Sequence, residues 1–127
     1  NLAEAALLAG IEVRDLPSME ESARRLRQRG ARSVVITGGH LPEPVDLLAE
    51  GSRHGALEFR RFPGSRVDTG NTHGTGCAFS TALACNLALG KSLPDAVAAA
   101  KEYVTKALRT SYSVGKGPGP INHLFEL

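Results

Sequence analysis

The residues with the clearest chemical potential form a glycine-bearing loop in the second half of the chain. Gly74, Thr75 and Gly76 lead directly into Cys77, and an alanine-rich run follows. Glycines let the backbone bend with several amides pointing the same way, and the positive end of a helix dipole adds to their field. Such donors can stabilise the negative charge that develops in phosphoryl transfer. The loop therefore predicts an anion hole, with a purely structural strand-to-helix turn as the alternative.

Cys77 is expected in the first turn of the following helix, where the dipole favours a thiolate. Two interpretations stay open for it, a reactive thiol or a small residue that packs the helix against a sheet. Cys85, two turns further along among alanines, is predicted to be buried. His73 could contact a phosphate or hold the loop by hydrogen bonding. It could also be the base of a cysteine hydrolase or transferase with Cys77 as nucleophile, although no third orienting group is evident.

The elements that must position this loop follow from hydrophobic periodicity and from helix-capping signals. Four helices are predicted, at 1–9, 18–30 (opened by a capping box at Ser18–Glu21), 76–89 and 92–112. Strands are predicted at 33–37, 45–50 and 56–62, with 51–55 as a hairpin loop, and at 66–69. An amphipathic helix that runs into an apolar strand is typical of an α/β fold.

Composition narrows the class of protein further. The 127 residues, 42% hydrophobic and 22% charged with a net charge of +2, suit one globular domain. Two cysteines exclude a disulfide scaffold, and they favour a reducing compartment. No apolar run is long enough for a membrane helix, and no signal peptide is evident. Nucleic-acid binding is not expected, because the chain has only six aromatic residues and no concentrated basic stripe. The arginines at 24–29 could bind an anion, but we interpret them as a solvated helix face.

Three motifs carry a resemblance to a known family. They are NTHGTGC at 71–77, GGHL at 38–41 and GxGPxNH at 117–123. In this order they resemble the hydroxymethylpyrimidine/phosphomethylpyrimidine kinases of thiamine biosynthesis, which belong to the ribokinase-like superfamily. Other branches of that superfamily usually carry aspartate at the position of Cys77, so the resemblance favours the pyrimidine kinases over sugar kinases.

The resemblance implies a fold and a reaction. The chain would be the C-terminal part of a ribokinase-like three-layer α/β/α fold. It would phosphorylate hydroxymethylpyrimidine and then its monophosphate, with ATP as the phosphoryl donor. Cys77 would be the catalytic base, and Gly74, Thr75 and Gly76 would supply the amides that hold the transferring phosphoryl group.

Further residues are implied to bind the nucleotide and the metal. Thr37, Gly39 and His73 would contact ATP, although Thr37 stands where the family commonly has lysine. Asn1 and Glu4 would help to place Mg²⁺, often through water. Asn followed three residues later by Glu is also the pattern of a helix capping box, which is the structural alternative for this pair.

The resemblance also implies that much of the protein lies elsewhere. Residues 1–127 would be one partial kinase domain whose N-terminal half is missing. We expect a need for that half or for a partner chain, a homodimer, and a cytoplasmic location. A non-catalytic nucleotide-binding half or remnant of such a kinase is the main alternative, with a cysteine hydrolase or transferase behind it.

Overall fold

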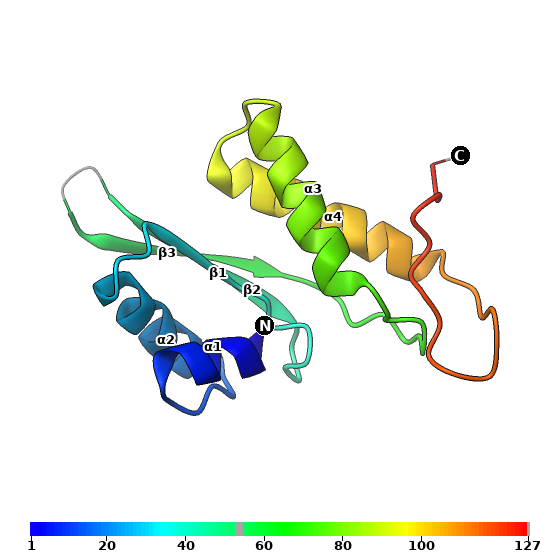
Figure 1. The fold of residues 1–127 in the computed structure, drawn as a ribbon, viewed down its shortest axis with the longest axis horizontal. Helices are drawn as coiled ribbons and strands as arrows, with labels where there is room; N and C mark the ends of the chain where they lie inside the picture. The colour runs from blue at the N-terminus through cyan, green and yellow to red at the C-terminus, as the bar shows by residue number, and fades with distance from the viewer. Residues whose placement is uncertain (53–54, 127) are drawn as a thin grey trace. The chain divides into compact units, whose positions relative to one another are not determined.

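The computed structural model describes residues 1–52 and 55–126. The chain divides into two compact units, Asn1–Arg66 and Val67–Leu127. In the first unit α1 (Leu2–Ala9) and α2 (Leu16–Gln28) precede β1 (Ser33–Ile36), β2 (Val45–Gly51) and β3 (Leu57–Pro63). The strands form one antiparallel sheet in the order β1-β2-β3, with Ile36 opposite Leu47. Both helices lie on the same side of this sheet (Figure 1).

The core of the first unit lies between α2 and the sheet. Met19 and Ala23, one helical turn apart, are fully buried, and the cluster they belong to includes Leu47 and Ala49. Leu47 and Ala49 share a face of β2 because side chains alternate along a strand. Burying a side chain the size of Met19 contributes roughly 1.5–3 kcal/mol. Met19 and Ala23 thus form the buried face of the helix.

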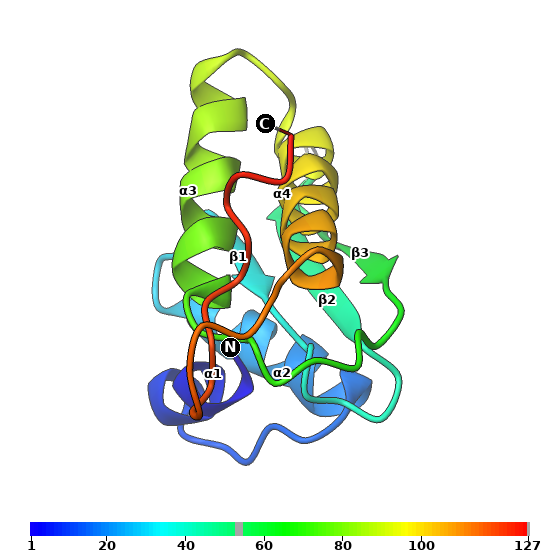
Figure 2. The same ribbon diagram turned by 90° about the vertical axis from the view of Figure 1, so that its right-hand side faces the viewer.

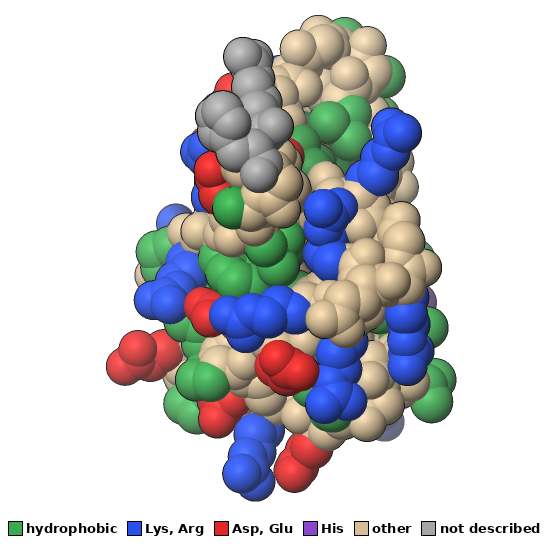
Figure 3. All heavy atoms as spheres, turned by 90° about the vertical axis from the view of Figure 1, so that its left-hand side faces the viewer, with side chains coloured by type: hydrophobic (Ala, Val, Ile, Leu, Met, Phe, Trp, Pro, Cys, Tyr) green, Lys and Arg blue, Asp and Glu red, His purple; other side chains and the backbone are tan. Residues whose placement is uncertain are grey.

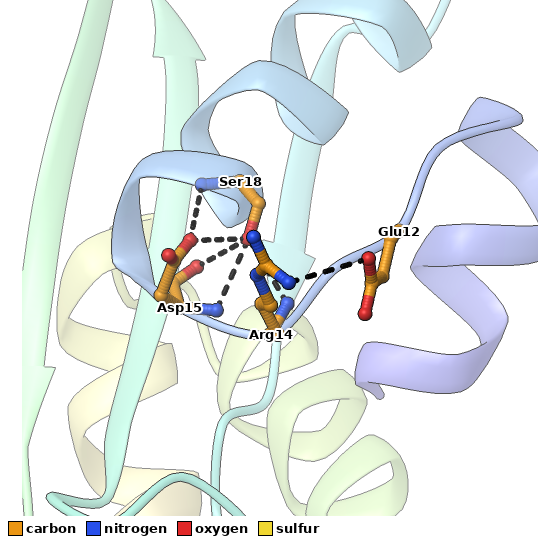
Figure 4. Close-up of polar contacts among 4 residues, drawn as sticks. All are labelled: Glu12, Arg14, Asp15 and Ser18. Atoms are coloured by element: carbon orange, nitrogen blue, oxygen red, sulfur yellow. Dashed lines mark hydrogen bonds and ion pairs between the residues drawn. The ribbon is translucent and has the colours of Figure 1, made fainter.

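The start of α2 differs from the prediction. Asp15 is the N-cap, and Ser18, which the sequence suggested as the cap, is the third residue of the helix. The Asp15 carboxylate accepts the Ser18 N–H at 2.9 Å, and Ser18 Oγ accepts the Asp15 N–H at 3.0 Å (Figure 4). Pro17 made a later start look natural, but proline is tolerated in the first helical turn, where its missing N–H has no partner to lose.

The two strands predicted at 45–50 and 56–62 are confirmed, and they form the antiparallel hairpin of β2 and β3. Of the predicted hairpin loop at 51–55, positions 53 and 54 lie outside the described residues. Ser52 donates its N–H to the Ala56 carbonyl at 2.6 Å, and Gly55 has a φ of +83°. A positive φ is readily adopted by glycine, which explains that residue at the turn.

The second unit contains α3 (Thr75–Ala88) and α4 (Leu93–Arg109), which pack against each other. The C-terminal segment then returns along α4, where the Asn122 N–H donates to the Ala107 carbonyl at 3.0 Å (Figure 2). The helix predicted to reach Tyr112 ends at Arg109, with Thr110 as its C-cap. Residues 66–69, predicted as a strand, form no ladder within the described part of the chain, so that prediction is wrong for this structure.

Two arginines of the run on α2 are ion-paired, as expected of a solvated helix face. Arg25 lies 2.9 Å from the Glu21 carboxylate, and Arg24 lies 3.7 Å from that of Glu20. The Arg24 guanidinium also sits 5.0 Å from the centroid of the Phe59 ring. Both basic and acidic side chains are exposed on the face drawn in Figure 3. None of the helices in the described residues has both the length and the apolar character needed to cross a membrane.

Candidate active site

The first turn of α3 presents free backbone donors. Gly74 is the N-cap, with φ +89° and ψ −1°, and no side chain caps this helix. The amides of Gly76 and Cys77 have no hydrogen-bond acceptor among the described residues. The Thr75 amide differs from the expectation, because it is turned back onto the Thr72 carbonyl at 3.3 Å. Two free amides at the positive end of a 14-residue helix form a natural site for an anion.

Uncapped helix starts are the exception in this chain. The other three described helices have side-chain caps from Asn1, Asp15 and Ser92. Such a cap is worth about 0.5–2 kcal/mol, so leaving α3 without one sacrifices stability. The structure therefore brings Gly74, Gly76 and Cys77 together at one helix end, where the sequence placed them.

Cys77 is exposed in the first turn of α3, so its sulfur is not enclosed by aliphatic neighbours. An exposed thiol beside free amides can meet a bound molecule, which a buried packing residue could not do. The prediction for Cys85 is wrong, because this residue is also exposed. Helix α3 itself carries small residues on every side, and Ala78 and Phe79 are its only buried residues. The hydrophobic periodicity of its sequence therefore did not reveal the buried face.

The C-terminal segment holds the loop that leads into α3. His73 donates its N–H to the Gly119 carbonyl at 3.1 Å, and its own carbonyl accepts the Ile121 N–H at 3.2 Å. The His73 side chain is exposed. Among the roles considered for His73, the backbone of this residue therefore performs the one of holding the loop. The parallel bridge between His73 and Pro120 needs no N–H from the proline, which has none to donate.

Asn71 is a residue whose role the sequence did not reveal. It is 7% exposed, and its Oδ1 accepts the Gly119 N–H at 3.1 Å. A Cβ at Gly119 would collide with the Asn71 side chain, which explains glycine at that position. The two residues are 48 positions apart. The only signal in the sequence is that both belong to the motifs of the family it resembles.

The predicted nucleotide-binding residues Thr37 and Gly39 lie in the first unit, just after β1. Thr37 is half-buried and Gly39 is exposed. The turn they share is held by Asp46, a buried carboxylate on β2 that accepts the Gly38 N–H at 2.9 Å. A Cβ at Gly38 would collide with the Val45 carbonyl, so glycine is required there. Asp46 was missed, although a carboxylate within an apolar strand is itself a signal.

Asn1 and Glu4 lie together at the start of α1, where they form a capping box. The Glu4 carboxylate is 70% exposed, and the Asn1 side chain accepts the Glu4 N–H at 3.0 Å. The structural alternative for this pair is thus present. Within the described residues no group of three or more His, Cys, Asp and Glu side chains converges as a metal cage would require.

Comparisons with known proteins agree with this architecture. The phosphomethylpyrimidine kinase family profile matches residues 1–122. A hydroxymethylpyrimidine/phosphomethylpyrimidine kinase of Streptomyces coelicolor is 45% identical over 97% of this chain and 44% of its own length. The thiamine biosynthesis bifunctional protein ThiED of Geobacter sulfurreducens is 45% identical over 98% of this chain and 25% of its own length.

A solved structure extends the likeness to the fold. Bacillus subtilis pyridoxal kinase in an ADP complex matches 97% of this chain and 47% of its own, with a TM-score of 0.87 and 37% identity. The predicted ribokinase-like α/β fold is therefore confirmed. The chain spans a quarter to a half of the length of these relatives. Since the family profile covers nearly all of its residues, the chain belongs to the phosphomethylpyrimidine kinase family.

Proposed function

We propose that the protein carrying this chain, at its natural full length, phosphorylates 4-amino-5-hydroxymethyl-2-methylpyrimidine and then its monophosphate, with ATP as donor. The observation that carries the proposal is the uncapped start of α3, where the free amides of Gly76 and Cys77 adjoin an exposed thiol. The name of the Streptomyces relative, a hydroxymethylpyrimidine/phosphomethylpyrimidine kinase, supports the reaction. The ADP complex of the Bacillus pyridoxal kinase supports the nucleotide.

In this proposal the chain's residues divide the work of one in-line transfer. The Cys77 thiolate accepts the proton of the substrate's hydroxymethyl group, whose oxygen bonds to the γ-phosphorus as the bond from that phosphorus to ADP breaks. ADP leaves with the electron pair of that bond. The amides of Gly74, Gly76 and Cys77 donate to the phosphoryl oxygens, on which negative charge is spread in the transition state. Because the amides of Gly76 and Cys77 have no acceptor to give up among the described residues, they need little reorganisation during the reaction.

The nucleotide and metal contacts are further parts of the proposal. Thr37, Gly39 and His73 would contact the nucleotide, with Thr37 donating a hydroxyl hydrogen bond at the position where the family resemblance implies lysine. Mg²⁺ usually takes one or two carboxylates with phosphates and waters, and the exposed Glu4 carboxylate fits that donor set. Bound there beside Asn1, the ion would neutralise phosphate charge. Glu4 would then exchange its capping contacts for the metal.

The chain's share of its relatives' length supports a proposal about the rest of the enzyme. Because the chain spans 44% of the Streptomyces relative, we place the rest of the pyrimidine pocket in an N-terminal half or in a partner chain. A homodimer in the cytoplasm completes the proposal.

One specific observation favours a second candidate, a nucleotide-binding half without catalysis. Thr37 cannot neutralise the charge of a phosphate as lysine does, and this lowers the expected affinity for ATP. In that case the protein would bind ATP and release no ADP.

The test measures ADP release by the full-length protein with and without the hydroxymethylpyrimidine. We expect ADP only with the pyrimidine, and we expect Cys77→Ala to lower kcat about 100-fold or more, as loss of a positioned base does. ATP affinity should stay near that of the unsubstituted protein. Cys77→Asp should keep part of the activity, since a carboxylate is also a base.

The matched control is Cys85→Ala, because Cys85 is an exposed thiol on the same helix outside the anion loop. It should leave kcat unchanged. Full activity in Cys77→Ala would exclude the thiol as base. ATP binding without turnover in the unsubstituted protein would support the binding half instead. A covalent acyl-enzyme formed without ATP would point to a cysteine hydrolase.

A further inference from the structure

The contacts between the anion loop and the C-terminal segment suggest more than local packing. We propose that Asn71 and Gly119 are positioning residues, which clamp residues 119–123 onto the loop and thereby aim the amides of α3 at the transferring phosphoryl group. This inference rests on the proposed function and assigns the C-terminal segment a part in turnover.

The clamp begins with the side chain of Asn71. The buried Asn71 side chain accepts the Gly119 N–H at its Oδ1 at 3.1 Å, and the backbone N–H of Asn71 donates to Thr69 Oγ1 at 3.1 Å. Ser111 Oγ lies 3.0 Å from Thr69 Oγ1 and donates its proton to the Leu108 carbonyl. Since a hydroxyl has one proton, Thr69 must be the donor to Ser111. A directional chain of hydrogen bonds therefore links the loop to the end of α4.

The clamp continues through the backbone of His73. Hydrogen bonds to Gly119 and from Ile121 fix both its N–H and its carbonyl, so the peptide planes on either side of His73 cannot rotate freely. The next residue is Gly74, the N-cap of α3. Its orientation decides where the Gly76 and Cys77 amides point.

The far end of the segment is also anchored beside the N-cap. His123 Nε2 would lie 3.9 Å from a Cβ built on Gly74. The other ring nitrogen of His123 is 3.5 Å from the Tyr103 hydroxyl on α4, and the Tyr103 ring packs against that of Phe125 in a tilted arrangement with 5.2 Å between ring centroids. Contacts on both sides of the loop therefore hold residues 119–123 in place.

Local capping cannot do this work at α3. A side-chain cap would accept hydrogen bonds from the first-turn amides and would compete with the phosphate for them. Support from a distant segment orients the same amides without occupying them. A positional error of about 1 Å in such groups can cost about 100-fold in rate.

The test is a double-substitution cycle in the full-length enzyme. Asn71→Ala removes the acceptor, and Gly119→Ala adds a methyl group that collides with Asn71. We expect each to lower kcat about 10- to 100-fold with little change in KM for ATP, because positioning acts mainly in the transition state. In the double variant the new methyl group occupies the space that Asn71 vacated. Its kcat should therefore be no lower than that of Asn71→Ala.

Hydrogen exchange gives a readout that does not depend on activity. The amides of His73 and Ile121 should exchange faster in Asn71→Ala, and Asn71→Asp, which keeps the Oδ1 acceptor, should restore their protection. Ser92→Ala is the control, because it destabilises the same unit at the start of α4 and should leave kcat unchanged.

The two hypotheses fail in different ways. Unchanged kcat in both single variants, or fully additive losses in the double variant, would overturn the clamp. Unchanged exchange at His73 and Ile121 in Asn71→Ala would overturn it as well. Faster exchange in a protein that never phosphorylates the pyrimidine would reject the proposed function and leave the loop's support by Asn71 intact.

Discussion

Helices α2 and α3 have nearly the same length, 13 and 14 residues, yet they begin in opposite ways. At α2 the side chains of Asp15 and Ser18 exchange hydrogen bonds with each other's backbone amides, and the N-cap is extended, with φ −152° (Figure 4). At α3 the N-cap is Gly74, with φ +89° and no capping side chain. The start of α2 satisfies its backbone N–H donors with its own side chains, and the start of α3 leaves its N–H donors without a side-chain acceptor.

The source of support also differs between the two ends. The capping contacts of α2 join residues three positions apart. The loop before α3 is held by Gly119, which lies 48 positions from Asn71. A locally capped end gains stability from the residues that build it. An end that must bind an anion needs distant support, because every nearby acceptor would compete for its amides.

The strongest test of this difference installs a cap on α3. Gly74→Asp places a carboxylate beside the amides of Gly76 and Cys77, where it would accept their hydrogen bonds and repel phosphate. Because loss of one such donor typically costs about 100- to 1000-fold, we expect kcat to fall by at least about 100-fold. Initial rates of ADP formation in the full-length protein measure the effect.

Two companion variants separate charge from backbone strain. Gly74→Asn also adds a Cβ at positive φ, but asparagine tolerates this conformation and carries no charge, so it should retain more activity than Gly74→Asp. Asp15→Gly, the reverse exchange at α2, should lower stability and leave kcat unchanged. Equal activity in Gly74→Asp and the unsubstituted protein would mean that the start of α3 binds no phosphate.

A smaller effect is expected at α4, whose first turn is capped by Ser92. Its Oγ accepts the Asp95 N–H at 3.3 Å. Ser92→Ala should lower the free energy of unfolding by about 0.5–2 kcal/mol, as loss of an N-cap does, without changing turnover. Urea denaturation of the full-length protein measures the loss, and Ser92→Asp should recover most of it. A fall in kcat at unchanged stability would contradict a purely structural cap.

The same contrast explains which features the sequence could predict. The hairpin and the start of a helix just after the glycine-bearing loop at 74–76 depend on neighbouring residues, and the local pattern predicts them. The pattern left two interpretations of Cys77 open, and its exposure favours the reactive thiol. The alternative proposed for Asn1 and Glu4, a capping box, is local as well and is present. Local features were also misplaced: the start of α2, because Asp15 and Ser18 both suit an N-cap, the end of α4, and the strand predicted at 66–69.

The local sequence pattern could not predict contacts between residues that lie far apart in the chain. Nothing in the spacing of Asn71 and Gly119 shows that one accepts a hydrogen bond from the other. The same holds for Asp46, whose carboxylate supports the Gly38 turn from the neighbouring strand. Cys85 was misassigned for a related reason, since a helix built from small residues on all sides has no apolar stripe to read.

The smallest effect is a pH dependence at α2 that α3 should lack. Hydrogen bonds from the Ser18 side chain and backbone lower the pKa of Asp15 below its usual value of about 3.9. A lowered folded-state pKa contributes stability at pH values above the unfolded-state pKa, and this contribution is lost as the pH falls through the folded-state pKa. Asp15→Asn keeps a capping side chain but cannot titrate. Urea midpoints measured from pH 7 to pH 2 should therefore fall less steeply in Asp15→Asn below about pH 4.

The control is Gly74→Asn, which changes no titrating group and should show the same fall of the urea midpoint with pH as the unsubstituted protein. If Asp15→Asn and the unsubstituted protein show the same urea midpoints relative to pH 7 throughout the acid range, the Asp15 cap carries no charge-dependent stability.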